Sequence, residues 1–159
     1  MLRLRPLSTA DQQVLWDLLH VALWDPPPAG LRPREILQNP AVRIYAEDWG
    51  RAGDLGVLAE DESGEIAGAC WMRLIKGGAG LGYVDDETPQ LGIALLPKYQ
   101  HQGHGAPLML AALDAAEAYG FRQVSLTVHP QNPAIRLYER CGFEKRELRN
   151  SYHLMVATL

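Results

Sequence analysis

Two glycines stand between a short apolar stretch and a run rich in alanine and leucine, an arrangement suited to binding a phosphate. Residues 91–105 read LGIALLPKYQHQGHG, with Gly103 and Gly105 near the end, and residues 106–120 continue as APLMLAALDAAEAYG. The second run predicts a helix, and glycine lets another molecule come close to the main chain. Free N–H groups at a helix N-terminus point outward and carry partial positive charge. We therefore expect a phosphate or pyrophosphate at this loop.

Two other glycine-rich nucleotide motifs fit this loop less well. The dinucleotide-binding fingerprint needs Gly-x-Gly-x-x-Gly, but Leu108 holds the position of its third glycine. That fingerprint also opens the first βαβ unit of a fold, whereas this loop lies two thirds of the way along the chain. The P-loop of nucleotide hydrolases ends in Gly-Lys-Ser/Thr, and no such sequence follows here. A dinucleotide-dependent oxidoreductase is therefore disfavoured.

A second segment, residues 132–143 with the sequence NPAIRLYERCGF, predicts a short helix that carries a tyrosine. Asn132 is a favourable N-cap, and Pro133 suits the first position of a helix. Tyr138 has an ordinary structural interpretation, in which its ring packs in the core and its hydroxyl bonds to backbone. The apolar residues around it are expected in the core.

Together the two segments resemble motifs A and B of the GNAT superfamily of acyl-CoA-dependent N-acetyltransferases. Gln100, Gly103 and Gly105 match the pattern Gln/Arg-x-x-Gly-x-Gly/Ala, and residues 132–143 match the form NPAxxLYxxxGF. The resemblance is most specific over residues 90–143. It implies an α/β fold, with a mixed, mostly antiparallel twisted sheet of about six or seven strands, a central parallel pair and about four flanking helices.

The resemblance also implies a role for each matched residue. Backbone groups of the central strand would bind the acyl and pantetheine groups of coenzyme A, and the glycine loop would hold its pyrophosphate. Tyr138 would protonate the leaving sulfur as general acid. Asn132 would bond the cofactor, although it lies one residue closer to Tyr138 than in the NxxAxxLY form of the motif. The implied cofactor-binding residues are Ile93, Ala94, Leu95, Gln100, His101, Gln102, Gly103, His104, Gly105, Ala106 and Asn132.

Acetyl transfer from a thioester to an amine asks for few groups. The amine must be neutral to attack, and a backbone N–H stabilises the negative oxygen of the tetrahedral intermediate. A positioned hydroxyl assists the departure of the thiolate. A free amine has a pKa near that of lysine, about 10.4, so a base or a water relay must take its proton.

The two positions where relatives carry a glutamate hold residues that cannot serve as the base. The central strand has Gln90, and the matching position on the following strand is Thr127. Glu87 is the remaining candidate, next to Asp86, although a run of acidic residues is more often a solvated loop. A water relayed from Gln90 is an equal alternative.

Metal and thiol chemistry are both disfavoured. His101 and His104 have an HxxH spacing, but no acidic or cysteine ligand is near them in the sequence. Cys70 and Cys141 lie in apolar surroundings and are expected to be small buried hydrophobes. Two cysteines make no disulfide framework, so a reducing cytoplasm is the expected location.

The composition suits one globular domain over residues 1–159, with 47% hydrophobic and 21% charged residues. A net charge of −4 argues against nucleic acid or an anionic membrane as the main partner. No apolar run approaches the roughly 18 residues that span a bilayer, and no N-terminal signal pattern is present.

The remaining sequence predicts strands, helices and turns in the order of the GNAT fold. Strands are expected at residues 2–6, 55–60, 65–75, 124–128, 144–149 and 152–158, and helices after Ser8 or Thr9, at 34–38, after Gly105 and at 134–140. Residues 42–49 are ambiguous. Trp16, His20 and Trp24 share a helical face, which reads either as packing or as an aromatic wall of the acceptor site.

The sequence thus predicts an N-acetyltransferase in which a primary amine attacks acetyl-CoA directly in a ternary complex. The acceptor would be a small molecule or a peptide, with polyamines, amino acids, aminoglycosides, peptide N-termini and lysine all open. The alternative is an acyl-CoA-binding regulatory module with little or no turnover, which the missing strand glutamate favours. The family includes both monomers and homodimers, and the sequence does not choose between them.

Overall fold

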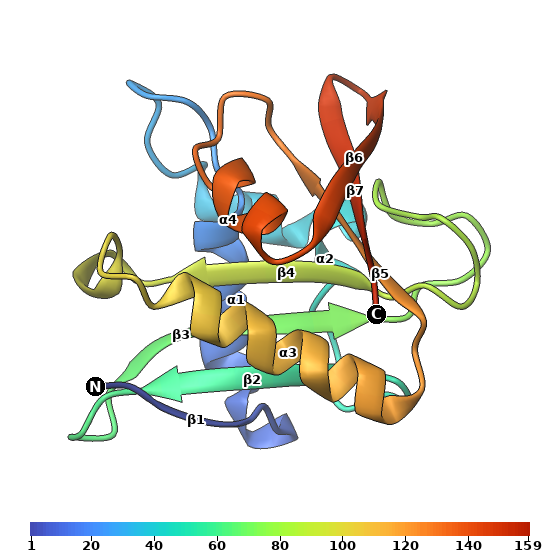
Figure 1. Ribbon diagram of the computed structural model, residues 1–159. Helices are drawn as coiled ribbons and strands as arrows, with labels where there is room; N and C mark the ends of the chain where they lie inside the picture. The colour runs from blue at the N-terminus through green and yellow to red at the C-terminus, as the bar shows by residue number, and fades with distance from the viewer.

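Seven strands form one sheet in a computed structural model that describes residues 1–159 (Figure 1). Their spatial order is β1-β2-β3-β4-β5-β7-β6. All neighbours are antiparallel except β4 and β5, which are parallel. This mixed sheet confirms the predicted fold class. The strands are β1 (Arg3–Pro6), β2 (Leu55–Glu60), β3 (Ile66–Arg73), β4 (Gln90–Leu95), β5 (Gln123–Val128), β6 (Phe143–Arg149) and β7 (Tyr152–Thr158).

Four α-helices cover the two faces of the sheet. The long helix α3 (Gly105–Tyr119) crosses in front of β2, β3 and β4 in Figure 1, and α4 (Ile135–Arg140) lies on the same side. Helix α1 (Gln12–Ala22) lies behind the sheet with the single-turn helix α2 (Pro40–Arg43). Short 3₁₀ turns occupy Thr9–Asp11, Arg34–Gln38 and Pro97–Tyr99.

Each face of the sheet has its own hydrophobic core. On the α3 side the cluster includes Leu108 and Met109 of α3 with Val124, Leu126 and Met155 of β5 and β7. The α1 side is smaller and is built from the leucines of α1 around Trp71 of β3. Strands β3 and β4 contribute to both clusters because successive side chains point to opposite faces. The central strands are therefore covered on both sides and rigidly placed.

Local residue types account for the geometry at the ends of several elements. Gly120 ends α3 with φ of 109°, in the left-handed region that favours glycine. Asn150 and Ser151 both have positive φ and make the tight turn between β6 and β7. Asn39 serves two elements: its N–H donates to the Ile36 carbonyl at 3.1 Å and closes the preceding 3₁₀ turn, while its Oδ1 accepts the Ala41 N–H at 2.9 Å and caps α2.

Helix α4 begins later than the sequence predicts. Asn132 was expected to cap a helix starting at Pro133, but the α-helix starts at Ile135. The Oδ1 atom of Asn132 accepts the Ala134 N–H at 2.9 Å. Asn132 therefore closes a turn ahead of the helix, and the short segment 132–134 connects β5 to α4.

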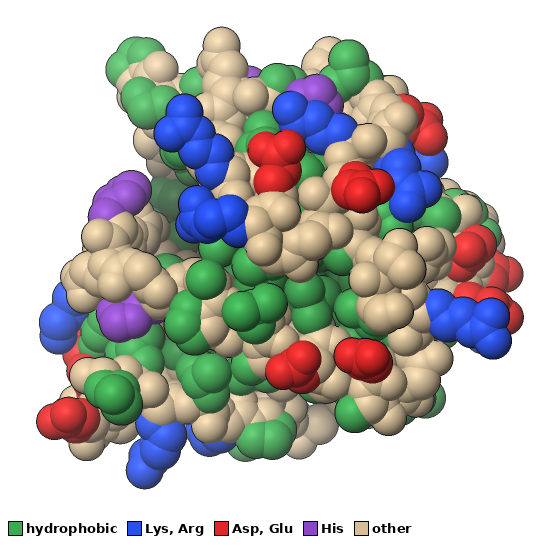
Figure 2. Space-filling model, in the orientation of Figure 1, with side chains coloured by type: hydrophobic (Ala, Val, Ile, Leu, Met, Phe, Trp, Pro, Cys, Tyr) green, Lys and Arg blue, Asp and Glu red, His purple; other side chains and the backbone are tan.

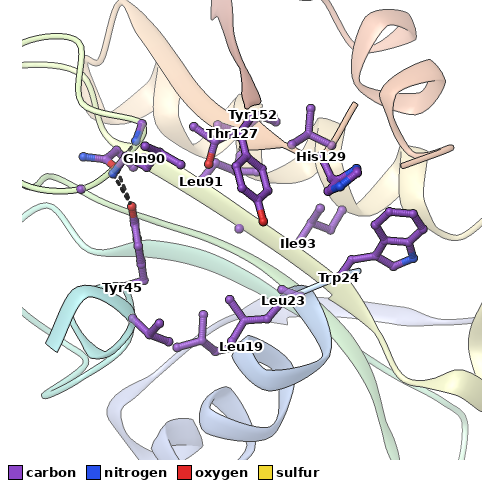
Figure 3. A pocket seen from close by; sticks show the side chains of 18 of the residues that line it. Leu19, Leu23, Trp24, Tyr45, Gln90, Leu91, Ile93, Thr127, His129 and Tyr152 are labelled. Atoms are coloured by element: carbon purple, nitrogen blue, oxygen red, sulfur yellow. Dashed lines mark hydrogen bonds between the residues drawn. The ribbon is translucent and has the colours of Figure 1, made fainter. Parts of the chain in front are cut away.

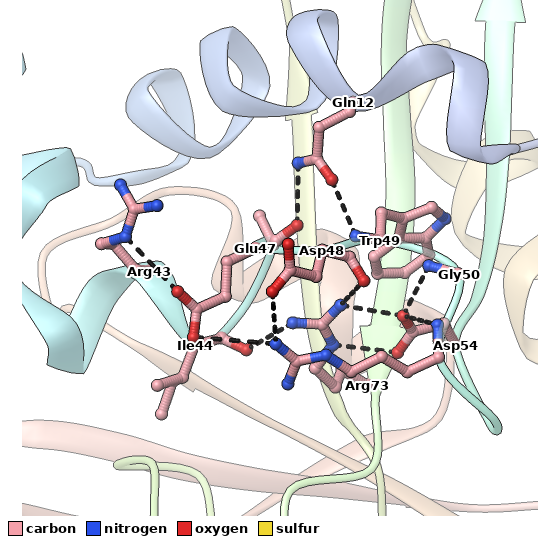
Figure 4. A network of polar contacts seen from close by, with 11 residues as sticks. Gln12, Arg43, Ile44, Glu47, Asp48, Trp49, Gly50, Asp54 and Arg73 are labelled. Carbon is pink, nitrogen blue, oxygen red and sulfur yellow. Dashed lines mark hydrogen bonds and ion pairs between the residues drawn. The ribbon is translucent and has the colours of Figure 1, made fainter.

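A buried ion pair fixes the segment after α2 (Figure 4). Arg73 donates from Nε to Asp54 Oδ1 at 2.9 Å and from Nη2 to Asp54 Oδ2 at 2.8 Å, with side-chain exposures of 3% and 1%. Arg73 also donates to the Ile44 carbonyl at 3.0 Å. Gln12 of α1 donates to the Ala46 carbonyl and accepts the Trp49 N–H. These contacts tie residues 44–49 to both β3 and α1.

Charges of both signs are interspersed on the face that carries α3 and α4, and no field of one sign covers it (Figure 2). None of the helices combines the length and the apolar character needed to cross a membrane.

Candidate active site

The parallel strands β4 and β5 separate soon after they meet. Gln90 and Ser125 are the one residue pair that joins them, supported by a hydrogen bond from Ser125 N to the Pro89 carbonyl at 3.0 Å. Beyond that point the two strands diverge. A cavity of about 600 Å³ opens along the divergence, and 16 of its 25 lining residues are hydrophobic (Figure 3).

The β4 edge next to this cavity has no partner strand. Ile93, Ala94 and Leu95 pair with β3 on one side only, opposite Cys70, Ala69 and Gly68 respectively. Ile93 lines the cavity (Figure 3). Because β5 has turned away, outward backbone groups of this stretch have no partner strand. The Leu95 carbonyl is an exception, since it accepts a hydrogen bond from Gln100. The unpaired groups need another partner, which a ligand in the cavity can supply.

The loop that follows β4 is folded onto its own backbone. Gln100 donates from Nε2 to the Leu95 carbonyl at 2.8 Å, and Gln102 donates to the Lys98 carbonyl at 2.9 Å. His101 and Gly103 both have positive φ, at 61° and 81°. These conformations turn the chain sharply into α3, whose N-terminus then faces the loop. The Gln100 side chain is thus occupied in shaping the loop.

Tyr99 anchors this loop to the distant β2–β3 turn. Its hydroxyl lies 2.7 Å from Asp61 Oδ2 and 2.8 Å from Glu65 Oε2. Lys98 adds an ion pair to Glu65 at 2.9 Å. Hydrogen bonds from Ser63 and Tyr99 lower the pKa of Asp61, and the acceptor Asp61 raises the pKa of the Tyr99 phenol. These contacts fix the start of the glycine loop relative to the β2–β3 turn.

The Tyr138 side chain of α4 lines the cavity with its hydroxyl unpaired. The residue is only 8% exposed, and its ring packs edge-on against Phe143 with 6.2 Å between centroids. No hydrogen bond within the protein uses the hydroxyl, and its oxygen is not among the fully buried polar atoms, so the hydroxyl is accessible from the cavity. Burial raises the pKa of Tyr138, so the phenol keeps its proton at neutral pH. The group is available as a proton donor.

Asn132 also lines the cavity. Its Oδ1 accepts the Ala134 N–H, and its Nδ2 group makes no hydrogen bond within the protein and can donate to a ligand. His101, Gln102, His104 and Ala106 stay on the loop and the first turn of α3. No group of three or more His, Cys, Asp or Glu side chains gathers as a metal would require.

Gln90 is bound within a closed network at one end of the cavity (Figure 3). Its Oε1 accepts the Tyr45 hydroxyl at 3.0 Å and the Gly82 N–H at 3.1 Å, while Nε2 donates to the Ala79 carbonyl at 3.0 Å. Tyr45 in turn accepts the Leu81 N–H at 3.0 Å. Both lone-pair directions of Oε1 are occupied, which leaves Gln90 no acceptor for a relayed water.

Glu87 is not brought to this cavity. It is exposed, and it lines a separate hollow together with Asp85, Asp86 and Lys76. Its own backbone N–H donates to Asp85 Oδ1 at 2.9 Å. The structure thus gathers Ile93, Asn132 and Tyr138 around one cavity and places Glu87 elsewhere.

Several polar residues around the cavity are not identified as site residues by the sequence, among them Arg32, Thr127, His129 and Tyr152. The period of two along β5 carries the signal for two of them, because Thr127 and His129 lie on the same face as Ser125. Nothing local identifies Arg32 and Tyr152, which are 120 positions apart in the chain and bonded to each other.

The predicted aromatic wall is present only in part. Trp24 lines the cavity and packs edge-on against His129 at 5.6 Å between centroids. Trp16 is covered by Arg43, whose guanidinium carbon lies 4.8 Å from the ring centroid. His20 donates from Nε2 to the Arg32 carbonyl at 2.6 Å, so its role is to hold the loop after α1.

Comparison with known proteins assigns the chain to a family. The sequence profile described as the acetyltransferase (GNAT) family matches residues 16–143, most of the chain. The protein belongs to the GNAT family. This confirms the resemblance seen in the two motifs, and Tyr138 and the glycine loop both lie inside the matched region.

Curated relatives cover this chain but extend beyond it. Mycothiol acetyltransferase from Clavibacter michiganensis is 34% identical over 137 residues, covering 85% of this chain and 40% of that protein. The ribosomal protein bS18-alanine N-acetyltransferase of Escherichia coli is 38% identical over 69 residues, 43% of this chain and 47% of the relative. The chain thus matches less than half of the length of either relative.

Solved structures share the fold at low sequence identity. The GNAT domain of S. lividans PAT has a TM-score of 0.71 at 16% identity, covering 99% of this chain and 90% of that one. Spermidine N-acetyltransferase from Vibrio cholerae, solved with CoA and spermine, has a TM-score of 0.66 at 20% identity, covering 99% and 95%. These likenesses concern the fold alone.

Proposed function

We propose that the protein transfers an acetyl group from acetyl-CoA to the primary amine of a small molecule or peptide. The amine attacks directly in a ternary complex, without a covalent enzyme intermediate. The observation that carries this proposal is the divergence of β4 and β5, which leaves the β4 edge over Ile93–Leu95 unpaired beside the free hydroxyl of Tyr138. The two free cysteines fit a reducing cytoplasm.

The thioester end of acetyl-CoA would lie along the open β4 edge. Outward backbone N–H and C=O groups over Ile93, Ala94 and Leu95 would bond the acyl and pantetheine groups, as a partner strand would, apart from the Leu95 carbonyl that Gln100 occupies. The loop from Gln100 to Ala106 would hold the pyrophosphate at the N-terminus of α3, where free N–H groups and the helix dipole favour an anion. The Nδ2 donor of Asn132 adds a contact at the cavity wall.

The chemical step uses few protein groups. The amine lone pair attacks the thioester carbonyl carbon, and a β4 backbone N–H stabilises the resulting oxyanion. The carbon–sulfur bond then breaks, and the thiolate takes the proton of the Tyr138 hydroxyl. The proton released by the former amine restores Tyr138 through solvent. The products are the acetylated amine and free CoA.

The amine is made neutral by its surroundings rather than by an adjacent carboxylate. No Asp or Glu lines the cavity, and Arg32 is its one charged residue. The apolar wall lowers the pKa of a nearby ammonium group, which favours the neutral nucleophile, and Arg32, paired with Asp25, offers that group no acceptor. Glu87 stays a prediction, because from its exposed hollow it would act only through a chain of waters.

Calorimetric titration with acetyl-CoA, and with NAD in a parallel run, tests the cofactor. We expect micromolar binding of acetyl-CoA alone, on the order of −8 kcal/mol. An amine panel monitored by free-thiol release then tests turnover. Binding of NAD without acetyl-CoA would overturn the proposal.

The second candidate is an acyl-CoA-binding module with little turnover. It is favoured by the same cavity wall, which offers neither a carboxylate nor a free Gln90 acceptor to the amine. Tight acetyl-CoA binding without thiol release across the whole amine panel would establish it in place of the enzyme.

A further inference from the structure

The cavity wall carries one cation and no anion. Among its 25 lining residues Arg32 is the one with a formal charge, and none is Asp or Glu. A polyamine enters such a cavity with several positive charges, and each would lose its hydration without gaining a carboxylate. The wall therefore disfavours polycationic acceptors, although a protein of the same fold was solved with spermine.

The Arg32 side chain is held by hydrogen bonds within the protein, and one of its nitrogen donors is unused. Its Nε and Nη2 atoms donate to the two carboxylate oxygens of Asp25 at 2.9 and 3.0 Å, and Nη2 also donates to the Tyr152 hydroxyl at 3.2 Å. Its carbonyl accepts the His20 N–H. No hydrogen bond within the protein uses Nη1. Arg32 lines the cavity and its partner Asp25 does not.

Tyr152 and His129 present two further donors beside Arg32. Tyr152 accepts from Arg32, so its own hydroxyl proton is free, and Figure 3 shows that hydroxyl directed into the cavity. His129 packs edge-on against Tyr152 at 5.7 Å between ring centroids. The Gln131 N–H donates to His129 Nδ1 at 3.0 Å, so the neutral imidazole carries its proton on Nε2 as a donor.

We propose that the amine acceptor bears a carboxylate, which Arg32, Tyr152 and His129 bind, and an apolar body that packs on Leu19, Leu23 and Val42. This inference rests on the proposed acetyl transfer and names its substrate class. A guanidinium with a neighbouring hydroxyl and imidazole N–H matches the several lone pairs of a carboxylate. Free amino acids and short peptides both offer this chemistry.

Calorimetry with matched ligands tests the assignment without turnover. L-leucine is compared with isoamylamine, its decarboxylated form, and with leucyl-leucine and spermidine, in the apo protein and in protein saturated with CoA. We expect at least one carboxylate-bearing ligand to bind tenfold or more tightly than isoamylamine or spermidine. Whether L-leucine or leucyl-leucine binds more tightly distinguishes a free amino acid from a peptide as the acceptor.

Two variants locate the carboxylate. Arg32→Met is expected to reduce the preference for the carboxylate-bearing ligand to within twofold, and Tyr152→Phe, which keeps the ring against His129, to reduce it severalfold. Arg34→Met is the matched control, because Arg34 follows in the same segment but pairs with Asp17 on the exposed surface. That variant should keep the full preference.

The inference is overturned if the wild type binds isoamylamine or spermidine as tightly as the carboxylate-bearing ligands, or binds none of the four. Retention of the preference in folded Arg32→Met would overturn it as well. Failure of acetyl transfer itself appears separately, as absence of thiol release from acetyl-CoA, while the binding comparison remains readable.

Discussion

Gly105, the first residue of α3, lies directly against Leu137 of α4. A Cβ at Gly105 would stand 2.8 Å from Leu137 Cδ2, closer than two carbon atoms pack. Its φ is not in the left-handed region, so the glycine is required by the contact and not by the backbone angle. The contact locks the start of the glycine loop's helix to the helix that carries Tyr138.

Substitution of Gly105 should therefore disturb Tyr138 as much as the loop. Gly105→Ala forces a rotamer change on Leu137, at a cost of about 0.5–1.5 kcal/mol, while Gly105→Val should destabilise by about 1–3 kcal/mol through overpacking. We expect Leu137→Ala to restore most of the stability of Gly105→Val in the double variant, measured by urea unfolding. Simple additivity of the two losses would contradict this coupling.

Gly103 is required for its backbone angle, and an equivalent glycine serves as its control. Gly103 and Gly64 have φ of 81° and 88°, and a Cβ at either would meet no atom within 4 Å. Valine at each should cost roughly 1–2 kcal/mol of stability. Only Gly103→Val should abolish acetyl-CoA binding in calorimetry, because only it lies on the proposed pyrophosphate loop. Unchanged affinity in a folded Gly103→Val would remove the pyrophosphate from this loop.

Tyr138→Phe should separate catalysis from stability. The hydroxyl has no protein partner, so we expect an unchanged unfolding midpoint and an unchanged KM for acetyl-CoA, with kcat reduced about 100-fold or more. Because burial raises the pKa of Tyr138, its ionisation should cause no loss of wild-type activity below about pH 10. Tyr119→Phe, at an exposed tyrosine, is the control. Full turnover in Tyr138→Phe would remove the general-acid assignment.

Gln90→Glu should not create a working base. The carboxyl would place an oxygen where Gln90 Nε2 now lies, 3.0 Å from the Ala79 carbonyl. The position is buried, with 3% of the residue exposed. Burial and the facing carbonyl raise the pKa of the introduced carboxyl in the folded state. Stability should then fall as pH rises from about 4.3, the unfolded value.

The measurement is the difference in thermal midpoint between Gln90→Glu and wild type at pH 5, 7 and 8. We expect the deficit to widen with pH until the raised folded pKa is passed. A deficit independent of pH would show that the introduced carboxyl is accommodated in its ionised form, and a gain in kcat would revive Gln90 as the position of the base.

Arg73→Met should be among the most destabilising single changes. It leaves Asp54 buried without its partner, at an expected cost of about 3–5 kcal/mol. Adding Asp54→Leu should recover much of that loss in chemical denaturation. Arg51→Met is the control, because Arg51 pairs with Asp48 at 48% and 88% exposure and should cost less than about 1 kcal/mol. Equal losses for Arg51 and Arg73 would contradict the buried network.

The sequence predicted the elements because their signals are local. Helix α3 and its end at Gly120, the turn at Asn150 and the loop with Gly103 each depend on residue types within a few positions. The acceptor side of the cavity is different. Arg32 and Tyr152 meet through a fold that brings together the loop after α1 and the β6–β7 turn, and no spacing in the sequence announces that contact.

Gln90 is a second case in which long-range contacts could not be predicted from the sequence. Its difference from glutamate was visible in the sequence, but its partners were not. Tyr45 and the segment 79–82 surround it, and nothing local in that glycine-rich segment indicates the contact. Glu87 is near Gln90 in the sequence, yet it lies in a turn over residues 85–88, and the two side chains line different hollows.

The single pairing of Gln90 with Ser125 divides the hydrogen bonding of the sheet into two blocks: β1 to β4, and β5 with β7 and β6. Blocks with few shared hydrogen bonds open separately in hydrogen exchange. A ligand that bridges the open β4 edge and Tyr138 couples the two blocks. Ligand binding should therefore slow amide hydrogen exchange in both blocks. The slowing should include β6, which forms no part of the cavity wall.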